Sequence, residues 1–431
     1  MTTTLEPRSA LAVPNLRRFL IGQGISNIGT FFQVVAQSLL VLDLTGSGLA
    51  LGAAMGMQFL PLLILGPSAG VVIDRVRIPR LLTATAVLAG IEALTLGLLT
   101  TTGHINVAWI LGLSFVLGIA QVGDRAAAQA FLTELVPREQ LPSAVGLAAV
   151  AQSVGRLGGP ALAAALYAWR GAAVCFYCNA ASYGAVVLSL LWLNRSELLP
   201  RIPQPRVAGQ LREGLRYAWR SSLLRQVLIV NAVVGALTFN FPIFYSSLVR
   251  LTFHAGPGAF GVAESLNAIT AVAGGFVLAR WLHRPTLRLF ALSCGLLGLS
   301  MLYSALSPTV TLFLVGMPAF GMVVVTYQTI GQSLLQQHTP GSMQGRIMSL
   351  FVLGTMGTTP VGGLVVGWII DARSPRAAIA LGGIAPLLCA VVLLGLSRRR
   401  HDPTGDEPRL EGDSGPLAGV GAGAEAANAP G

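Results

Sequence analysis

Apolar stretches of 18 or more residues recur along the whole of this chain. About 20 apolar helical residues cross a bilayer core of roughly 30 Å, where the backbone must satisfy its own hydrogen bonds. Only 10% of the residues are charged, against about 25% in soluble domains. We therefore predict an all-α membrane protein with twelve transmembrane helices, centred near residues 30, 60, 90, 118, 154, 182, 236, 270, 297, 321, 357 and 386.

A polar stretch rich in proline and arginine divides these predicted spans into six and six. We expect two six-helix bundles and, in the second part of the stretch (207–220), an amphipathic helix on the membrane surface. The chain after the last span is rich in Gly, Ala and Pro, which predicts disorder. The predicted parts are a cytoplasmic tail at 1–15, a bundle at 16–194, a cytoplasmic linker at 195–222, a bundle at 223–397 and a disordered cytoplasmic tail at 398–431.

The basic residues indicate how the chain is oriented in the membrane. All of them are arginines, and the net charge is +11. With these spans, 22 arginines fall on one side, four on the other, and Arg125 and Arg156 within spans. Because loops rich in positive charge stay in the cytoplasm, we expect both termini there and the protein in the cell membrane. The net positive charge is then explained by the orientation of the chain in the lipid bilayer and not by binding to a nucleic acid.

Signatures of enzyme chemistry are missing from the sequence. It contains no Walker loop, no Gly-x-Ser-x-Gly motif and no His/Cys group with metal-ligand spacing. The four cysteines fall in predicted spans and are expected to pack as small apolar residues. Cys175 and Cys178 form a Cys-x-x-Cys pair, for which a redox or metal role is the alternative. We expect no cofactor, no metal site and no enzymatic activity.

Residues 146–164 combine closely spaced small residues with a proline inside an apolar stretch. Gly155 and Gly159 are four residues apart, so they share a helix face and let a neighbouring helix approach closely. Pro160 follows directly, lacks an N–H and bends the helix. The sequence predicts a bent, tightly packed membrane helix, with ordinary Gly/Ala packing as the alternative to a role in transport.

The two halves of the chain repeat weakly. Gly70-Val-Val-Ile-Asp74-Arg75 at the end of the second span matches Gly275-Phe-Val-Leu-Ala279-Arg280 at the end of the eighth. The Pro160…Trp169 pattern of the fifth span likewise matches Pro360…Trp368 of the eleventh, where Gly362-Gly363 follow the proline. Proline- and glycine-interrupted spans at corresponding positions of two halves predict alternating access around a central cavity.

These features resemble the major facilitator superfamily over roughly residues 14–396. Gly146, Gly155, Gly159 and Pro160 are similar to the fifth-helix signature of its drug:proton antiporters, Gly-x8-Gly-x3-Gly-Pro-x2-Gly-Gly, from which this chain departs at Ala163-Ala164. We expect the two added methyl groups to loosen one contact between the halves. Further stretches resemble the subgroup of enterobactin exporters and macrolide efflux proteins: Asn15–Phe19, Ser26–Gly29, Leu42–Ser47, Glu134–Pro137 and Leu141–Ala144.

The resemblance implies secondary active efflux, usually proton-driven, of a drug, a siderophore or another amphipathic metabolite, by a protein that we expect to be monomeric. It also implies a cytoplasmic gate after the second span. The predicted gate residues are Gly70, Asp74, Arg75, Arg80 and Arg125. Arg125 or Arg346 is the candidate partner of Asp74, and simple positive-inside anchoring is the alternative. The chain departs from the family loop at Arg77, where the family has glycine, and at Pro79.

Charged residues within the spans need a reason, because each costs about 2.5–3.5 kcal/mol on insertion scales. Glu264, Glu92 and Asp124 are the candidates for proton coupling, since burial away from water favours the protonated carboxyl group. Glu264 is preferred to Glu92, because the third helix of each triplet usually supports the cavity from outside. Arg156 is a candidate partner of Glu92 or Asp124, or of an anionic substrate. For Asp124 and Arg125, structural ion pairs are the alternative.

Polar residues of the first, fourth, seventh and tenth spans are the candidates for lining the substrate cavity. A largely apolar pocket with a few amides suits an amphipathic ligand. Hydrogen bonds between helices are the alternative for about half of them. The set is Asn27, Gln33, Gln37, Gln121, Asn231, Asn240, Tyr327, Gln328 and Gln332.

Two other classes of function compete with efflux. The first is an importer or uniporter of a small nutrient or lysolipid, against which the fifth-span signature argues. The second is a membrane sensor or a thiol enzyme that uses Cys175 and Cys178.

Overall fold

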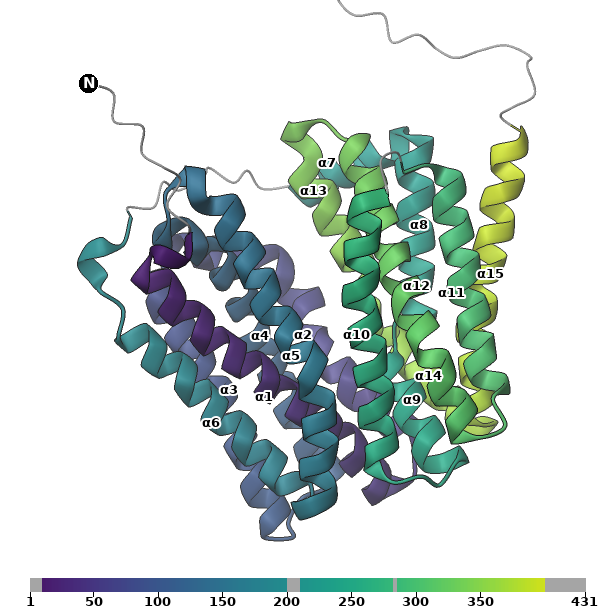
Figure 1. The fold of residues 1–431 in the computed structure, drawn as a ribbon, viewed down its shortest axis with the longest axis horizontal. Coiled ribbons are helices and arrows are strands. Elements are labelled where there is room, and N and C mark those ends of the chain that lie inside the picture. The colour runs from purple at the N-terminus through teal and green to yellow at the C-terminus, as the bar shows by residue number, and fades with distance from the viewer. Residues whose placement is uncertain (1–9, 200–209, 282–284, 400–431) are drawn as a thin grey trace, which may run out of the picture.

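The computed structural model describes residues 10–199, 210–281 and 285–399, with side chains described at all of these but 67–75, 210, 211, 279, 281, 342 and 397–399. The described chain is almost entirely helical (Figure 1). Most of the predicted C-terminal tail, the first residues of the N-terminal tail and the middle of the predicted linker lie outside the described residues. So do the side chains of the predicted gate residues Gly70, Asp74 and Arg75.

The first half of the chain forms six long helices: α1 (Pro14–Thr45), α2 (Gly48–Arg75), α3 (Ile78–Thr101), α4 (Val107–Leu135), α5 (Leu141–Arg170) and α6 (Ala172–Leu191). Short 3-10 turns precede α1, precede α5 and follow α6, at Ala10–Ala12, Arg138–Gln140 and Arg195–Glu197. The starts of two of the long helices are set by capping side chains. The side chains of Ser47 and Asn106 cap the N-termini of α2 and α4, each by accepting a hydrogen bond from a backbone N–H of the first turn.

The second half is more broken. Its helices are α7 (Gln210–Arg220), α8 (Ser222–Leu237), α9 (Phe241–Ser247), α10 (Pro257–Trp281), α11 (Leu287–Leu306), α12 (Val310–Gln337), α13 (Gly341–Val352), α14 (Thr359–Ala372) and α15 (Pro375–Arg399). Two π-helical turns, η4 (Leu248–Thr252) and η5 (Leu353–Gly357), continue α9 and join α13 to α14. The helices of the seventh and eleventh predicted spans are thus interrupted.

Eleven helical segments of the described chain are long and apolar enough to cross a membrane. The predicted count of twelve is therefore not reproduced by length and composition, because α5 does not qualify. This helix has 30 residues, which exceeds the length needed, but it carries Arg156 and packs between α1, α6 and α10.

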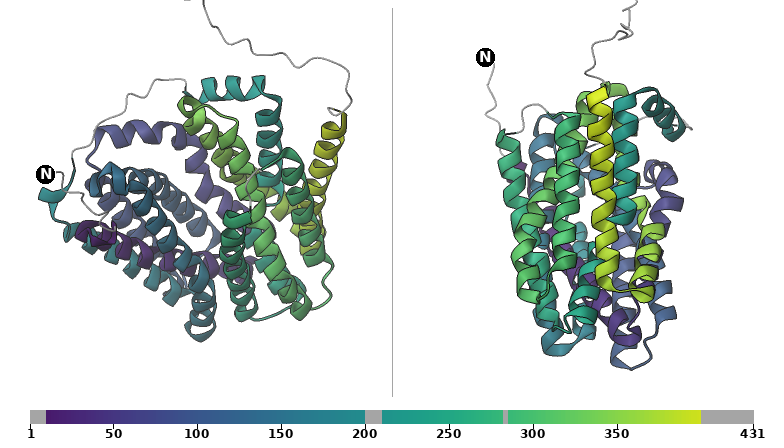
Figure 2. Two further views of the ribbon diagram at one scale, coloured as in Figure 1. Left: turned by 45° about the horizontal axis from the view of Figure 1, so that its top comes forward. Right: turned by 90° about the vertical axis from the view of Figure 1, so that its right-hand side faces the viewer.

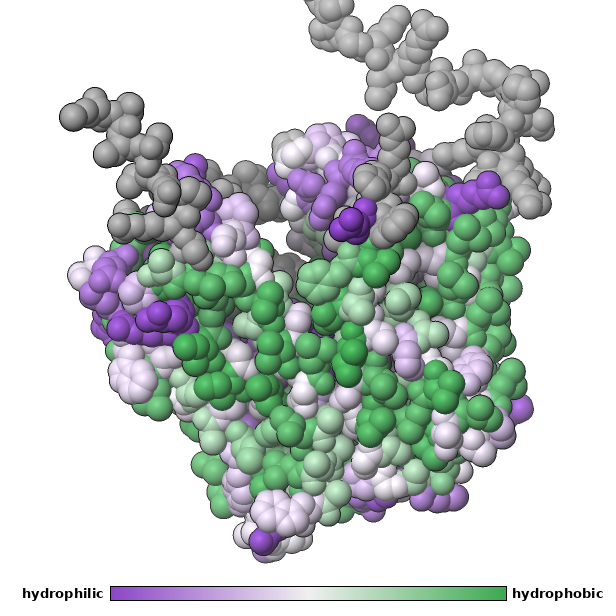
Figure 3. All heavy atoms as spheres, viewed as in Figure 1, coloured by the Kyte–Doolittle hydropathy of each residue, from purple (hydrophilic) through white to green (hydrophobic). Residues whose placement is uncertain are grey.

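The helices form two groups that stand side by side (Figures 1 and 2). In the first, α1 packs on α5 and α6, α3 on α4 and α6, and α2 on α4. In the second, α11 packs on α15 and α12, and α10 on α12. The groups meet through two helix pairs, α2 with α14 and α5 with α10. On the visible face, a wide band of apolar residues covers the middle, and polar residues gather toward the two ends of the molecule (Figure 3). A protein embedded in lipid requires this distribution.

α1 begins and α15 ends at the same end of the molecule, which we call the termini end (Figure 1). There the surface is notched between the two groups (Figure 3). The linker helix α7 also lies at this end, where it packs on α13 and where Arg346 forms a 2.8 Å ion pair with Glu213. The predicted amphipathic helix therefore exists from Gln210 onward, and it is attached to the second group.

Candidate functional site

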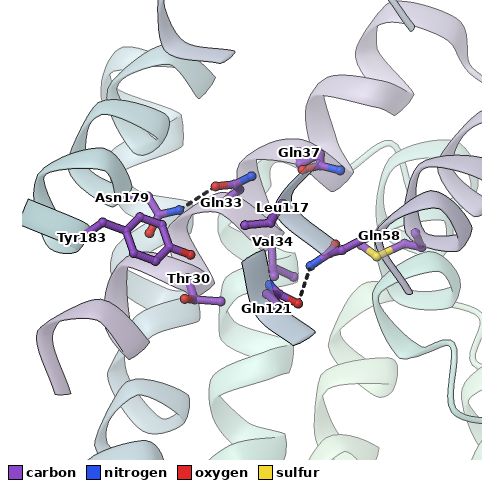
Figure 4. A pocket seen from close by; sticks show the side chains of 10 residues that line it. Thr30, Gln33, Val34, Gln37, Gln58, Leu117, Gln121, Asn179 and Tyr183 are labelled. Carbon is purple, nitrogen blue, oxygen red and sulfur yellow. Dashed lines mark hydrogen bonds between the residues drawn. The ribbon is translucent and has the colours of Figure 1, made fainter. Parts of the chain in front are cut away.

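A small polar pocket lies inside the first group of helices, between α1, α2, α4 and α6 (Figure 4). Its lining is dominated by amides. The polar residues that contribute are Thr30, Gln33 and Gln37 of α1, Gln58 of α2, Gln121 of α4, and Asn179 and Tyr183 of α6. Gln33, Gln37 and Gln121 were predicted to line the cavity, whereas Gln58 and Asn179 were not, because they lie on the second and sixth spans.

The amides of the pocket bind one another across helices. Asn179 Nδ2 donates to Gln33 Oε1 at 2.5 Å, and Gln58 Nε2 donates to Gln121 Oε1 at 3.4 Å (Figure 4). Gln37 Nε2 donates to Ser114 Oγ at 2.9 Å. These bonds satisfy polar groups between the helices, and they leave each amide with further donor or acceptor capacity. The space between them, about 10 Å³, has room for one water molecule.

Glu92 lies directly behind this pocket. It projects from α3 and is 1% exposed. Both of its carboxylate oxygens lie within hydrogen-bond distance of Gln33 Nε2, at 3.0 and 3.1 Å. The sequence-based argument treated the third span as a support outside the cavity, but one glutamine connects this carboxylate to the pocket.

The predicted cavity residues of the second half have mixed positions. Asn231 is buried and donates to the backbone oxygen of Phe351 at 2.8 Å and to Thr355 Oγ1 at 3.0 Å. It thereby ties α8 to the end of α13 and to η5. Asn240 is buried in the break after α8 and donates to the Ala236 carbonyl. Asn231 thus acts between helices, the alternative that the sequence left open, whereas Asn240 makes a local bond at the end of α8.

The aromatic and remaining amide residues of the predicted cavity lie on α1 and α12. Tyr327 is fully buried, with its ring stacked on Phe290 at a centroid distance of 5.1 Å. Gln328 and Gln332 are half-buried on α12. Asn27 is half-buried on α1, and its backbone and Cβ pack against Gly155 of α5.

Four charged residues lie near the boundary between the two groups. Arg156 of α5 interacts electrostatically with Glu264 of α10 and with Arg125 of α4. Asp124 interacts with its neighbour Arg125, which also donates to Met356 Sδ in the second group at 3.1 Å. Arg156 thus interacts electrostatically with Glu264, which the sequence did not suggest, while Glu92 is hydrogen-bonded to Gln33 instead.

Of the predicted gate residues, the structure describes the side chains of Arg80 and Arg125. Arg80 is exposed at the start of α3, and Arg346, a candidate partner of Asp74, is paired with Glu213 in this conformation. Arg125 contacts the second group through Met356.

The glycine signature of α5 has two different parts. A Cβ atom added at Gly159 would lie 2.7 Å from Phe31 Cβ, and one added at Gly155 would lie 2.8 Å from Asn27 Cβ. Both glycines therefore bring α5 onto α1 within the first group. An added Cβ at Gly146 would meet no atom within 4 Å, so close packing does not explain the first glycine of the signature.

At Ala163-Ala164, which were expected to loosen one contact between the halves, α5 lies close to α10. Ala164 Cβ packs directly where a Cβ of Gly261 would stand, and a Cβ there would also lie 2.8 Å from the Pro160 carbonyl. The missing glycine of α5 is thus replaced by a glycine on the facing helix, α10, and the helices stay close.

Two features of the interface were missed by the sequence-based argument. The first is a row of glycines on α2, Gly48, Gly52 and Gly56, which packs on Gly363 and Gly367 of α14. An added Cβ at Gly52 would overlap the carbonyl oxygen of Gly363. The four-residue spacing of Gly48, Gly52 and Gly56 is a signal by which this contact face could have been found.

The second feature is a set of polar contacts between the groups at the end opposite the termini, which we call the far end. The carboxylate of Asp371 accepts hydrogen bonds from Ser47 Oγ and Gly48 N, each at 2.6 Å, and from Leu49 N at 3.1 Å. Asp43 forms an ion pair with Arg250 and accepts a 2.7 Å hydrogen bond from the Tyr167 hydroxyl.

Comparison with known proteins agrees with this architecture. Residues 5–414 match the family described as transmembrane secretion effector. Macrolide efflux protein A of Streptococcus pyogenes is 22% identical over 334 residues, which cover 76% of this chain and 82% of that protein. Enterobactin exporter EntS of Citrobacter koseri is 24% identical over 375 residues, 84% and 85% of the two chains. A crystal structure of a peptide transporter in complex with sulfate aligns with a TM-score of 0.72 at 13% identity, covering 91% of this chain and 97% of that one.

Proposed function

The chain belongs to the transmembrane secretion effector family of the major facilitator superfamily, and on this premise we propose that it exports an amphipathic compound in exchange for protons. It is a multi-pass membrane transporter of the efflux type. Because its relatives are named for macrolides and for enterobactin, a macrolide-like drug or a siderophore is the class of cargo to test first. The cargo crosses chemically unchanged.

We also propose that the protein is a monomer in the cytoplasmic membrane with both termini in the cytoplasm. The distribution of arginines supports this orientation. One chain supplies both helix groups and all walls of the polar pocket, which supports a monomer. With this orientation, the notched termini end faces the cytoplasm (Figure 3), where an exporter takes up its cargo, and the bonded far end faces outward.

The observation that carries the proton-coupling proposal is the contact between Glu92 and Gln33. A carboxylate at 1% exposure that is compensated by an amide, and not by a permanent cation, can gain or lose a proton without breaking an ion pair. Glu264 and Asp124 are the second candidates. Glu264 interacts electrostatically with Arg156 of the other group, which suits an ion pair that forms in one conformation and breaks in the other.

The cytoplasmic gate is proposed at Gly70, Asp74, Arg75, Arg80 and Arg125. In support, Arg125 reaches the second group at Met356. Arg346 is held by the linker helix α7 through Glu213, so movement of that helix would release Arg346 for a new partner.

Transport in inside-out membrane vesicles tests the proposal. Vesicles from an efflux-deficient bacterial host that expresses the protein are given an acidic interior, and uptake of radiolabelled erythromycin and of a fluorescent amphipathic dye is followed. Uptake that requires the pH gradient and disappears with a protonophore is expected for the wild type. Gradient-driven uptake should be lost in Glu92→Gln and retained in the matched control Glu139→Gln, because Glu139 is exposed outside the spans.

The same assay separates the candidate carboxyl groups. Loss of gradient-driven uptake in Glu264→Gln or Asp124→Asn, with Glu92→Gln unaffected, would move the coupling site to that residue. Gradient-independent uptake by the wild type would refute proton coupling altogether.

A further inference from the structure

The side chain of Gln33 hydrogen-bonds both Glu92 and Asn179 and lines the polar pocket. Its Nε2 group faces the two oxygens of Glu92, and its Oε1 accepts from Asn179 Nδ2. Gln33 is 2% exposed and, with Asn179, lines the pocket, whereas Glu92 does not. A change at Glu92 therefore reaches the pocket through one amide.

We propose that Gln33 is a positioning residue whose side-chain amide turns over when Glu92 binds or releases a proton, and thereby changes the hydrogen-bonding groups that the pocket offers to its cargo. This proposal rests on proton coupling at Glu92, as proposed above. It assigns to Gln33 a role in linking the two ligands of the transporter, in addition to lining the pocket.

The direction of the turn follows from donor and acceptor chemistry. An ionised carboxylate only accepts hydrogen bonds, so it must face the NH₂ group of Gln33, as it does here. A protonated Glu92 carries an O–H, which needs an acceptor. The acceptor in reach is Gln33 Oε1, and rotating the amide by half a turn brings this oxygen to Glu92.

The turn must propagate to Asn179. Once Gln33 presents its NH₂ group to Asn179, two donors face each other, and Asn179 must turn its own amide to offer Oδ1. In the present arrangement Asn179 Oδ1 accepts from Ser182 Oγ at 3.2 Å, while Ser182 Oγ also reaches the Asn179 carbonyl at 2.7 Å. Ser182 can keep the second bond when the first is lost, while the hydrogen bond between Tyr183 and Asn179 must rearrange as well. Asn179 then presents its NH₂ group where it had presented an oxygen.

The charged and titratable neighbours of Glu92 do not oppose this reversal. α3 packs on α4 and α6, and Gln33 reaches it from α1. From α6, Tyr183 interacts electrostatically with Glu92 and also with Asp124 of α4. In the part of the chain that the structure describes, no arginine forms an ion pair with Glu92. In this proposal the proton comes from water on one side of the membrane, resides on Glu92, and leaves to water on the other side after the conformational change.

Binding of a fluorescent amphipathic dye to purified protein in nanodiscs, measured as Kd across a range of pH, tests the proposal. For the wild type we expect the Kd to change about tenfold between acidic and alkaline pH, which corresponds to about 1.4 kcal/mol. Gln33→Met keeps the length of the side chain but cannot reverse, so its Kd should be independent of pH. Glu92→Gln should also be independent of pH.

The matched control is Gln37→Met, one turn further along α1. Gln37 lines the same pocket but donates to Ser114 and not to Glu92. This variant should shift the Kd by a similar factor at every pH and keep the wild-type pH dependence. If Gln33→Met keeps the wild-type pH dependence while Glu92→Gln loses it, the role of Gln33 is refuted and coupling at Glu92 stands. If Glu92→Gln also keeps it, the proposed coupling site is refuted.

A second test uses the wild type and therefore does not require that the Gln33→Met variant folds. Infrared difference spectra are taken between acidic and alkaline pH. A carboxyl C=O band that titrates together with a shifted side-chain amide band, both absent from Glu92→Gln, is expected. A carboxyl band that titrates without any amide shift would overturn the proposal.

Discussion

The carboxylate of Asp371 accepts a 2.6 Å hydrogen bond from the hydroxyl of Ser47, although the two residues are 324 positions apart and belong to different helix groups. It also accepts from the first backbone N–H groups of α2. Asp371, at the C-terminal end of α14, therefore caps the N-terminus of α2, where a negative charge is favoured by the helix dipole and by unpaired donors. This contact stabilises the conformation in which the far end is closed.

Removing the charge of Asp371 should favour the opposite conformation. Asp371 is exposed, and a negative charge at an exposed helix N-terminus contributes about 0.3–1 kcal/mol, so Asp371→Asn should shift the ratio of the two conformations about two- to fivefold. Distance distributions between spin labels on the two groups at the far end measure this shift. Glu139→Gln is the control for loss of a carboxylate, and an unchanged distribution in Asp371→Asn would contradict the assignment.

The ion pair between Asp43 and Arg250 should contribute no more than this. Its side chains are 34% and 29% exposed, and such pairs contribute about 0.2–1 kcal/mol. Asp43→Asn and Arg250→Gln should therefore shift the same distances by no more than Asp371→Asn, and high salt should reduce the difference from the wild type. A larger effect of Arg250→Gln than of Asp371→Asn would show that the ion pair is the main contact.

The glycine row of α2 should not tolerate a methyl group. In Gly52→Ala the added carbon overlaps the Gly363 carbonyl, and overpacking of this kind costs about 1–3 kcal/mol. We expect a lower Tm in detergent and reduced transport. Gly112→Ala on α4 is the matched control, because a Cβ there meets no atom within 4 Å. Equal Tm values for the two variants would show that the helices can separate without loss.

The two parts of the α5 signature should respond differently to the same substitution. Gly159→Ala places a methyl group against Phe31 and should lower both Tm and transport, whereas Gly146→Ala meets no neighbour in this conformation and should keep the Tm. Normal transport by Gly146→Ala would show that this glycine is dispensable. Loss of transport with a normal Tm would instead indicate that Gly146 packs closely in the other conformation.

Much of the fold could be predicted because helix formation and membrane insertion depend on local composition. The long apolar stretches and the division at the linker are properties of short segments, and the structure contains helices at all of these stretches. The Gly155 and Gly159 face was predictable for the same reason, since residues four apart share a helix face.

The candidate site was predictable only in part. Gln33, Gln37 and Gln121 line the pocket as expected. Asn231 has the same chemistry and a similar position in its half, but it binds the backbone of Phe351 next to the π-helical turn η5. The same carbonyl accepts from Thr355 Oγ1 at 3.0 Å, and no pattern in the sequence predicts the π-helical turn.

The sequence by itself determined that this chain forms long membrane helices, how they divide into halves and which faces carry small residues. Only the tertiary structure decided which faces meet: Gly52 with Gly363, Ala164 with Gly261, Asp371 with the start of α2, and Gln33 with Glu92. The physical reason is that lipid and protein interior are almost equally apolar. Hydropathy therefore shows that a segment is in the membrane, whereas its neighbours are selected by shape and by the few polar groups that must find partners.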